Sequence, residues 1–249
     1  FEKAGSIWEK VFTTDQTINV QVNWTPLASN VLGSAGASNY YANFPGAARL
    51  NTFYPIALAE KIAHKNFNGT DPDIVARFNS DFTNWYKGVD GLPKAGKEYD
   101  LLSVVIHELG HGLGFIGQFE LSTDKTTVGY GYPGIFDQFM ETKAGVKLTD
   151  TTTAYKNNSA TLLSAVTAQS SLFLNAPNLV AANKNKGMLY SPKTFVDGSS
   201  IYHVDQYNYP VGDPNALMTP QIAPGEVTRS VGPIVEGFFK DMGWYGSSI

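Results

Sequence analysis

The stretch VVIHELGHGLGF, residues 104–115, constrains this chain more than any other segment. Its apolar residues predict a buried helix, and His107 and His111 lie one helical turn apart on the same face of it. Glu108 lies beside that face, where a carboxylate can contact a metal-activated water without binding the metal itself. Because unpaired ionisable groups are costly inside a buried helix, a shared zinc ion is the simplest partner for both imidazoles.

The bulk composition excludes several classes of partner. The 249 residues are 43% hydrophobic and 16% charged, a globular composition with enough chain for a sizeable core. A net charge of −4 offers no basic surplus for nucleic acid or an anionic membrane, so we expect neither as a partner. No apolar run reaches the roughly 18–20 residues that a membrane span needs. The absence of cysteine excludes disulfides, thiolate zinc ligands and a cysteine nucleophile.

Hydrophobic periodicity predicts an α+β fold. Residues 17–24 alternate apolar and polar side chains, the pattern of a half-buried strand, and residues 73–81 predict a second strand. We interpret the glycine-rich stretch 29–48 as a loop. Pro55 suits the first turn of a helix, and Asp100 is a candidate N-cap. The helices that we expect cover residues 4–13, 55–65, 99–112 and 232–244.

The amino-acid composition of the sequence changes after Gly117. Residues 118–232 are rich in Gly, Pro, Asn, Ser and Thr and contain short helical patches at 135–143 and 160–168. We therefore expect a single catalytic domain over residues 1–249, in which an α/β N-terminal lobe with a mixed sheet ends on the zinc helix and an irregular, mainly helical and loop C-terminal lobe follows. The two lobes cover residues 1–117 and 118–249. The last helix carries an apolar stripe that we assign to core packing: Ile234, Val235, Phe238, Phe239 and Met242.

A catalytic zinc site normally has three protein ligands and leaves one position for water, so a third ligand is needed. Only two further histidines exist in the sequence. His64 lies toward the end of a charged helix pattern, where a cation is an ordinary surface feature. His203 lies in the loop sequence IYHVDQYNYPVGDPNALMTP, fifteen residues before Met218.

The sequence HELGHGLGF resembles the extended zinc signature of the metzincin metallopeptidases, H-E-x-x-H-x-x-G-x-x-H, which is followed later by a Met-turn. Gly114 matches the glycine of that signature, and Gly117 stands at the position of its third histidine. The leishmanolysin-like branch departs in the same way, because a long insertion separates its third histidine from the signature. The segments IYHVDQ and NALMTP look like the motifs that carry the histidine and the Met-turn in that branch.

This resemblance implies a metzincin-like fold in which His107, His111 and His203 bind zinc (Zn2+) and Met218 forms an apolar floor beneath the imidazoles. Gly114 can take a positive φ, end the helix and turn the chain under the metal. The resemblance, together with a start that fits a mature or trimmed chain, implies a secreted, extracellular protein, and we expect a monomer. The chain departs from the best-known members in its lack of cysteine and its shorter length.

The chemistry that follows is hydrolysis of peptide bonds in a protein or peptide substrate. Glu108 would take a proton from a water whose pKa zinc has lowered toward about 7, and would pass it to the leaving amine. Asp205, two residues after His203, is a candidate to hold that ligand in place. A phenol would stabilise the oxyanion, and the candidate donors are Tyr202, Tyr207 and Tyr209.

Two other interpretations remain open. A carboxylate could be the third ligand, as in thermolysin-like enzymes, and Glu120 and Glu141 are then the candidates. Zinc could instead be structural in a non-catalytic binding domain, although a structural site normally has four protein ligands. Some aspartates beside Gly, Pro or Asn could bind calcium (Ca2+), although turns and caps account for most such residues. These are Asp71, Asp73, Asp90, Asp137, Asp197, Asp205 and Asp213.

Overall fold

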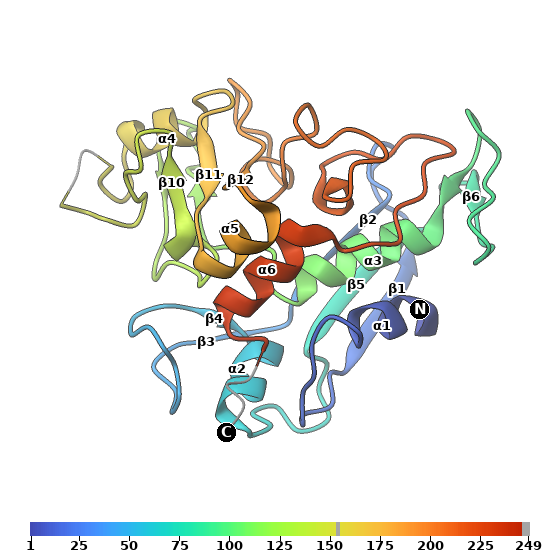
Figure 1. Ribbon diagram of the computed structural model, residues 1–249, viewed down its shortest axis with the longest axis horizontal. Helices are drawn as coiled ribbons and strands as arrows, with labels where there is room; N and C mark the ends of the chain where they lie inside the picture. Colours follow the sequence, from blue (N-terminus) through green and yellow to red (C-terminus); the bar gives the residue numbers. More distant parts are fainter. Residues whose placement is uncertain (153–154, 246–249) are drawn as a thin grey trace.

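Helix α3, Leu101–Gly112, runs through the middle of the molecule and carries the HELGH sequence (Figure 1). The computed structural model describes residues 1–152 and 155–245. The predicted N-cap is confirmed, because the carboxylate of Asp100 accepts hydrogen bonds from the backbone N–H and the hydroxyl of Ser103, at 2.8 and 2.6 Å. Arg229 Nη2 donates to the other oxygen of Asp100 at 2.7 Å and ties the start of the helix to the C-terminal half of the chain.

The end of α3 is a glycine turn. Gly114 has a φ of +121°, a left-handed conformation that favours glycine. The N–H of Phe115 donates to the carbonyl of Gly110, and the N–H of Gly114 donates to the carbonyl of His111, at 2.9 and 3.0 Å. These two bonds satisfy the last carbonyls of the helix, so the predicted role of Gly114 in ending it is confirmed.

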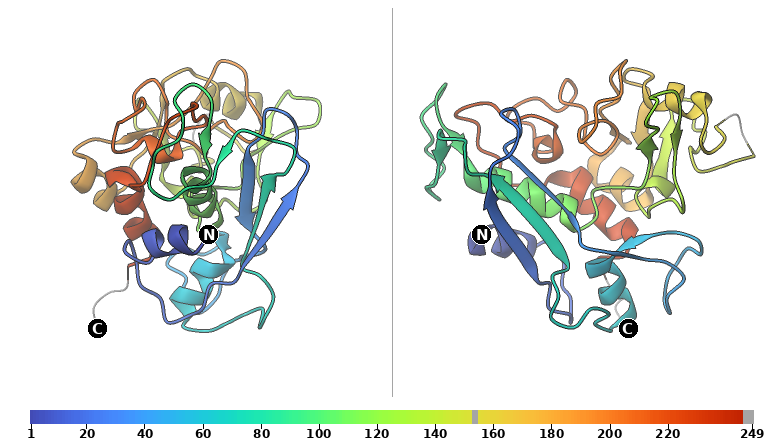
Figure 2. Two further views of the ribbon diagram at one scale, coloured as in Figure 1. Left: turned by 90° about the vertical axis from the view of Figure 1, so that its right-hand side faces the viewer. Right: turned by 180° about the vertical axis from the view of Figure 1, so that it is seen from behind.

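A mixed three-stranded sheet lies against α3. Its strands are β1, Val20–Thr25, β2, Gly33–Ala37, and β5, Ile74–Asn79, in the order β1-β5-β2. Strand β5 is parallel to β1 and antiparallel to β2, and the sheet runs obliquely across the helix (Figure 2). The two strands predicted from periodicity are β1 and β5.

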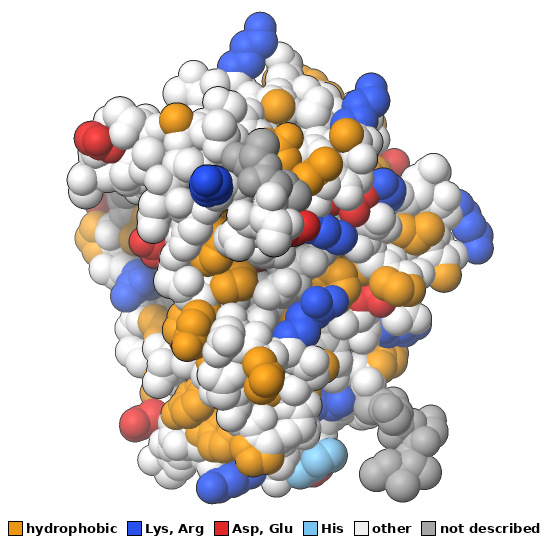
Figure 3. All heavy atoms as spheres, turned by 90° about the vertical axis from the view of Figure 1, so that its left-hand side faces the viewer, with side chains coloured by type: hydrophobic (Ala, Val, Ile, Leu, Met, Phe, Trp, Pro, Cys, Tyr) orange, Lys and Arg blue, Asp and Glu red, His pale blue; other side chains and the backbone are white. Residues whose placement is uncertain are grey.

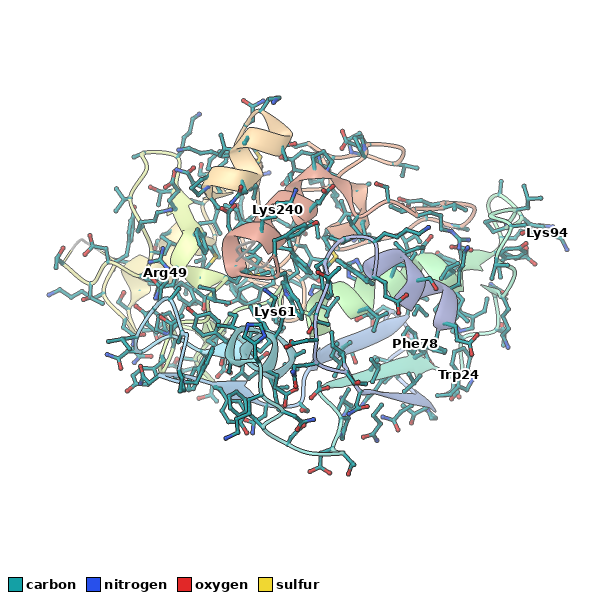
Figure 4. All side chains as sticks on the ribbon, turned by 60° about the horizontal axis from the view of Figure 1, so that its bottom comes forward. Trp24, Arg49, Lys61, Phe78, Lys94 and Lys240 are labelled. Atoms are coloured by element: carbon teal, nitrogen blue, oxygen red, sulfur yellow. The ribbon has the colours of Figure 1, made fainter. Side chains whose placement is uncertain are left out.

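The edge position of β1 leaves part of the inner face uncovered. Its apolar residues pair in register with the buried residues of β5, for example Trp24 with Phe78. Even so, Val20, Val22 and Trp24 remain 38–45% exposed, so the strand is confirmed, but the prediction that its apolar face is the buried one is wrong. Figure 4 shows Trp24 and Phe78 on neighbouring strands of this sheet.

The interpretation of residues 29–48 as a loop is wrong, because this stretch contains β2 and the short strand β3, Tyr40–Tyr41. The sequence of β2, GSAGA, has no β-branched residue and therefore a low strand propensity. Pairing with β5 supplies the strand instead. Small residues are needed because α3 lies so close: a Cβ atom on Gly33 would come within 3.1 Å of Cγ of Glu108.

The other elements of the N-terminal half are short. Helix α1 ends at Trp8, earlier than predicted, because Val11 and Phe12 turn into the core, where they are 8% and 7% exposed. The indole of Trp8 donates to the carbonyl of Ile106 and fastens α1 to α3. Helix α2 begins directly after Pro55, as predicted. The bounds are α1, Glu2–Trp8, β4, Tyr54–Pro55, α2, Ile56–Ala63, β6, Trp85–Tyr86, and β7, Tyr99–Asp100.

The C-terminal half is built from short elements joined by long irregular segments. Its elements are β8, Glu120–Leu121, β9, Val128–Gly129, η1, Asp137–Phe139, β10, Met140–Thr142, α4, Ala160–Val166, β11, Leu172–Leu174, α5, Pro177–Asn183, β12, Gly187–Met188, η2, Ala216–Met218, and α6, Gly232–Met242. The helical patch predicted at 135–143 is only one 3-10 turn, η1, followed by β10. Antiparallel pairing of β10 with β11 overrides the local helical pattern there.

One hydrophobic core joins the two halves of the described chain. The stripe on α6 is buried as predicted, and Phe239 stacks on Trp8 with ring centroids 5.1 Å apart. On the face in Figure 3, positive and negative side chains are scattered among uncharged ones. None of the helices within residues 1–152 and 155–245 has the length and apolar character that crossing a bilayer requires.

Candidate metal centre

The structure brings the three predicted histidines together. The Nε2 atoms of His107, His111 and His203 lie 3.1, 3.2 and 3.3 Å from one another. Nitrogens bound tetrahedrally to zinc at ~2.05 Å are about 3.3 Å apart, so the triangle has the size that this ion needs. In the described part of the chain, no other group of three His, Cys, Asp or Glu side chains is close enough to share an ion.

The hydrogen bonds of the imidazoles fix their tautomers. His107 Nδ1 lies 2.7 Å from the carbonyl of Leu217, His111 Nδ1 lies 2.8 Å from that of Phe115, and His203 Nδ1 lies 2.9 Å from that of Ser199. A carbonyl oxygen only accepts, so each Nδ1 carries the proton and each Nε2 presents a lone pair. These carbonyls orient the ligands in the way that metal-binding histidines require.

Burial keeps the three imidazoles neutral. It lowers the pKa of His107, lowers the pKa of His111 to about 3 and lowers that of His203 well below its ordinary value. The neighbouring imidazoles lower the pKa of His111 and His203 further. Three lone pairs therefore face one another with no proton between them, and a metal cation is the partner that satisfies them together.

The segment around His203 is anchored on both sides. The N–H of Val204 donates to the carbonyl of Met218 at 2.8 Å, and the N–H of Tyr190 donates to the carbonyl of His203 at 2.8 Å. The sulfur of Met218 is fully buried and packs against Gly110 of α3. Since Leu217 also accepts from His107, the turn η2 holds two of the three ligands in place.

Gly117 cannot carry the third ligand in this fold. A Cβ atom at this position would overlap the carboxylate of Asp137. Asp137 is fully buried and accepts hydrogen bonds from the N–H groups of Gln118 and Gly134, at 2.8 and 2.6 Å, and from the hydroxyl of Tyr202 at 3.0 Å. Burial raises the pKa of Asp137 to about 7, and the three donors act against that rise. The sequence does not predict that Asp137 joins these segments beside the histidines, because Asp137 resembles an ordinary turn residue there.

The three candidate phenols do not gather over the histidines. The hydroxyl of Tyr202 donates to Asp137 and accepts from the N–H of Phe119 at 2.6 Å, so it is already engaged. Tyr209 accepts from the N–H of Met188, and Tyr207 is 77% exposed. Neither Tyr207 nor Tyr209 lines the cavity that contains the histidines.

Glu108 lies with the three histidines in the wall of one open cavity of about 850 Å³. Its side chain is 6% exposed, and burial raises its pKa to about 8, while the backbone N–H of Ala35 acts in the opposite direction. A dication beside the carboxylate would favour its charged form. Residues 29–35, which include the start of β2, line one side of the cavity, and residues 219–222 line another.

The other candidate ligands are engaged elsewhere. Glu141 is buried between Lys147, at 3.0 Å, and Lys186, and Glu120 is exposed on β8. The carboxylate of Asp205 accepts from backbone N–H groups of its own turn, and among the described residues the Nδ1 of His203 meets the carbonyl of Ser199, so Ser199 supplies the support expected from Asp205. His64 pairs with Asp15 at the surface, as an ordinary surface histidine does.

Comparison with known proteins identifies a matching family model. A family model described as SPBPB7E8-like matches residues 21–127, which include β1, β2, β5 and α3 with His107, Glu108 and His111. No curated protein and no solved structure matches the chain. The matched range ends before His203 and Met218, so the inference of function rests on the geometry of the site.

Proposed function

We propose that this chain is a zinc-dependent endopeptidase of the metzincin type, closest in its ligand arrangement to the leishmanolysin-like branch, and that it acts outside the cell. The observation that carries the proposal is the convergence of three neutral Nε2 atoms beside the carboxylate of Glu108 in an open cavity. The third ligand in this proposal is His203, which η2 and Ser199 hold in place.

When bound at the three histidines, zinc supplies Lewis acidity that polarises a peptide carbonyl and makes a water more acidic. Glu108 accepts a proton from the attacking water and delivers it to the amine of the leaving fragment. The side chain of Glu108 lies against Gly33 at the start of β2. The carbonyls of Leu217, Phe115 and Ser199 keep the imidazoles in the tautomer that this chemistry needs.

Strand β2 provides a place for an extended substrate. It is an edge of the sheet, paired on one side with β5, and its first residues line the cavity beside Glu108. An extended peptide that adds to this edge would make main-chain hydrogen bonds whatever its side chains are. The carbonyl to be cleaved would then lie near the metal and the base.

The alternative of a structural zinc in a binding domain is less well supported. A structural site is closed by four protein ligands, whereas three histidines converge here and the cavity beside them is open. A zinc chelator separates the two functions. We expect phenanthroline to abolish casein hydrolysis and added zinc to restore it. A protein that loses thermal stability with the chelator but never cleaves casein would support the structural role instead.

The charge of the cavity predicts a preference among substrates. Its lining includes the carboxylates of Glu108, Asp197 and Glu226 and no Lys or Arg. Glu226 is 8% exposed, and its Oε2 accepts from the N–H of Ala223 at 2.8 Å. A buried carboxylate without a cationic partner favours a positively charged side chain of the substrate.

We therefore expect Glu226→Gln to lower kcat/KM for peptides with Lys or Arg near the cleaved bond by about tenfold relative to peptides with Leu there, which corresponds to ~1.4 kcal/mol. Glu236→Gln is the matched control, because Glu236 is exposed on α6. An unchanged ratio of the two kcat/KM values in Glu226→Gln would remove this residue from the substrate site.

A further inference from the structure

The turn that carries the third histidine adopts a conformation that its own residues do not favour. Within residues 199–203, Ile201 has a φ of +65°, in the left-handed region where a β-branched side chain crowds its own backbone. The turn brings the carbonyl of Ser199 back to Nδ1 of His203, at 2.9 Å, so the orientation of this imidazole depends on it. A strained conformation of this kind persists only where surrounding groups hold it.

One of the groups that hold the turn is the hydroxyl of Tyr202, which precedes His203 in the chain. The N–H of Phe119 can only donate, and its nitrogen lies 2.6 Å from the hydroxyl oxygen. That oxygen therefore accepts from Phe119, and its single proton is donated to Oδ1 of Asp137, at 3.0 Å. These two hydrogen bonds join the segment that follows α3 to the turn that carries the third histidine.

The second oxygen of Asp137 holds the segment after α3 directly. Oδ2 accepts from the N–H of Gln118 at 2.8 Å and from the N–H of Gly134 at 2.6 Å. Gln118 comes three residues after Phe115, whose carbonyl orients His111. With its two oxygens, the fully buried carboxylate of Asp137 therefore contacts a segment that supports one histidine and the residue next to another.

Close packing surrounds this carboxylate. A Cβ atom on Gly117 would overlap Oδ1 of Asp137 and would lie 2.7 Å from Cε1 of Tyr202, so the approach of the three residues requires glycine. The ring of Tyr202 also packs edge-on against Phe136, with centroids 5.3 Å apart, and Phe136 packs edge-on against Phe115 at 5.1 Å. These ring contacts do not need the hydroxyl, so the hydrogen bonds can be tested separately from the packing.

We propose that Asp137 is a positioning residue of the metal centre, which acts through the hydroxyl of Tyr202 and the backbone of Gln118. It holds the strained turn against the end of α3 and thereby keeps Nε2 of His203 within 3.2 and 3.3 Å of the Nε2 atoms of His111 and His107. This role rests on the proposed function in one respect, that the three histidines bind zinc. It does not depend on the substrate or on hydrolysis.

The test measures zinc binding by the full chain without substrate. Tyr202→Phe keeps the ring and removes only the hydroxyl, so it should fold and bind zinc about tenfold more weakly than the wild type, in competition with a chromogenic chelator. Asp137→Asn should weaken binding at least as much, because its amide group must turn an N–H towards one of the three donors. The visible absorption of the cobalt-substituted protein follows the geometry around the ion and should change in both variants.

Each variant has a matched control. The hydroxyl of Tyr209 also accepts from a backbone N–H, that of Met188 at 3.1 Å, but Tyr209 does not line the cavity of the histidines. Asp73 is likewise fully buried and accepts from a backbone N–H, that of Asn19 at 2.7 Å. We expect Tyr209→Phe and Asp73→Asn to lower the unfolding midpoint while they keep the zinc affinity and the cobalt spectrum of the wild type.

The possible results separate the positioning role from the proposed function. Wild-type zinc affinity and an unchanged cobalt spectrum in both Tyr202→Phe and Asp137→Asn would overturn the positioning role alone. Equal changes in the two control variants would also overturn it, because the effect would then follow from lower stability. A wild-type protein that binds no zinc would overturn the proposed function, and the positioning role with it.

Discussion

Replacing Glu108 by Gln should leave zinc binding intact and lower kcat for casein by about 10²–10⁴-fold, the range that a general base contributes. Glutamine has the shape of glutamate and fits against Gly33 in the same way, so the cavity wall should not move. It cannot hold the proton of the attacking water. The measurements are kcat on casein and the zinc content after dialysis.

Glu236→Gln serves again as the control for loss of one acid, since Glu236 is exposed and pairs only with Lys240. It should keep the wild-type rate. If Glu108→Gln binds zinc normally and cleaves casein at a comparable rate, Glu108 is not the base. If it loses zinc instead, the carboxylate contributes to holding the metal, and the three-histidine site is incomplete.

Replacing His203 by Ala should weaken zinc binding by more than about 100-fold and abolish hydrolysis. Groups that merely orient metal ligands already contribute about 10–100-fold, so loss of a ligand should cost more. The two remaining histidines, His107 and His111, would keep their carbonyl partners, Leu217 and Phe115, but could no longer enclose the ion. Competition with a chromogenic chelator measures the affinity directly.

His64→Ala is the matched control, because His64 is exposed and pairs with Asp15 at the surface. It should retain zinc and full activity. Wild-type zinc affinity in His203→Ala would show that the third ligand lies elsewhere and would reopen the thermolysin-like interpretation, for which Glu141→Gln is the next variant to measure. That substitution otherwise affects the ion pairs with Lys147 and Lys186 and the hydrogen bond that Asn175 donates.

Local features of the site could be predicted from the sequence. The spacing of His107 and His111 fixes their shared face on any helix, and Asp100 and Gly114 mark the two ends of that helix by their own conformational preferences. His203 could be named only through a resemblance of motifs. Its approach depends on the folding of residues 112–202, whose described part forms two small sheets, the helices α4 and α5 and the 3-10 turn η1, and no local pattern specifies how these close.

Features that depend on close packing could not be predicted. The strand β2 is hidden in a glycine-rich sequence because its pairing and the proximity of Glu108 decide its structure. Asp137 looks like a turn residue until the fold places it against Gly117 and Tyr202. The hydroxyl of Tyr202 is engaged by that contact and by the N–H of Phe119, and sequence proximity to His203 gives no sign of it.

The three carbonyls that orient the imidazoles have a consequence for metal exchange. Because Leu217, Phe115 and Ser199 each hold one imidazole by its Nδ1, none of the three rings can turn away without breaking a hydrogen bond. A metal that exchanged at the proposed site would therefore enter and leave through the open cavity. Nitrogen donors held in this way do not by themselves discriminate among divalent ions, so cobalt or copper could replace zinc in the proposed site, according to the supply of ions in the surroundings.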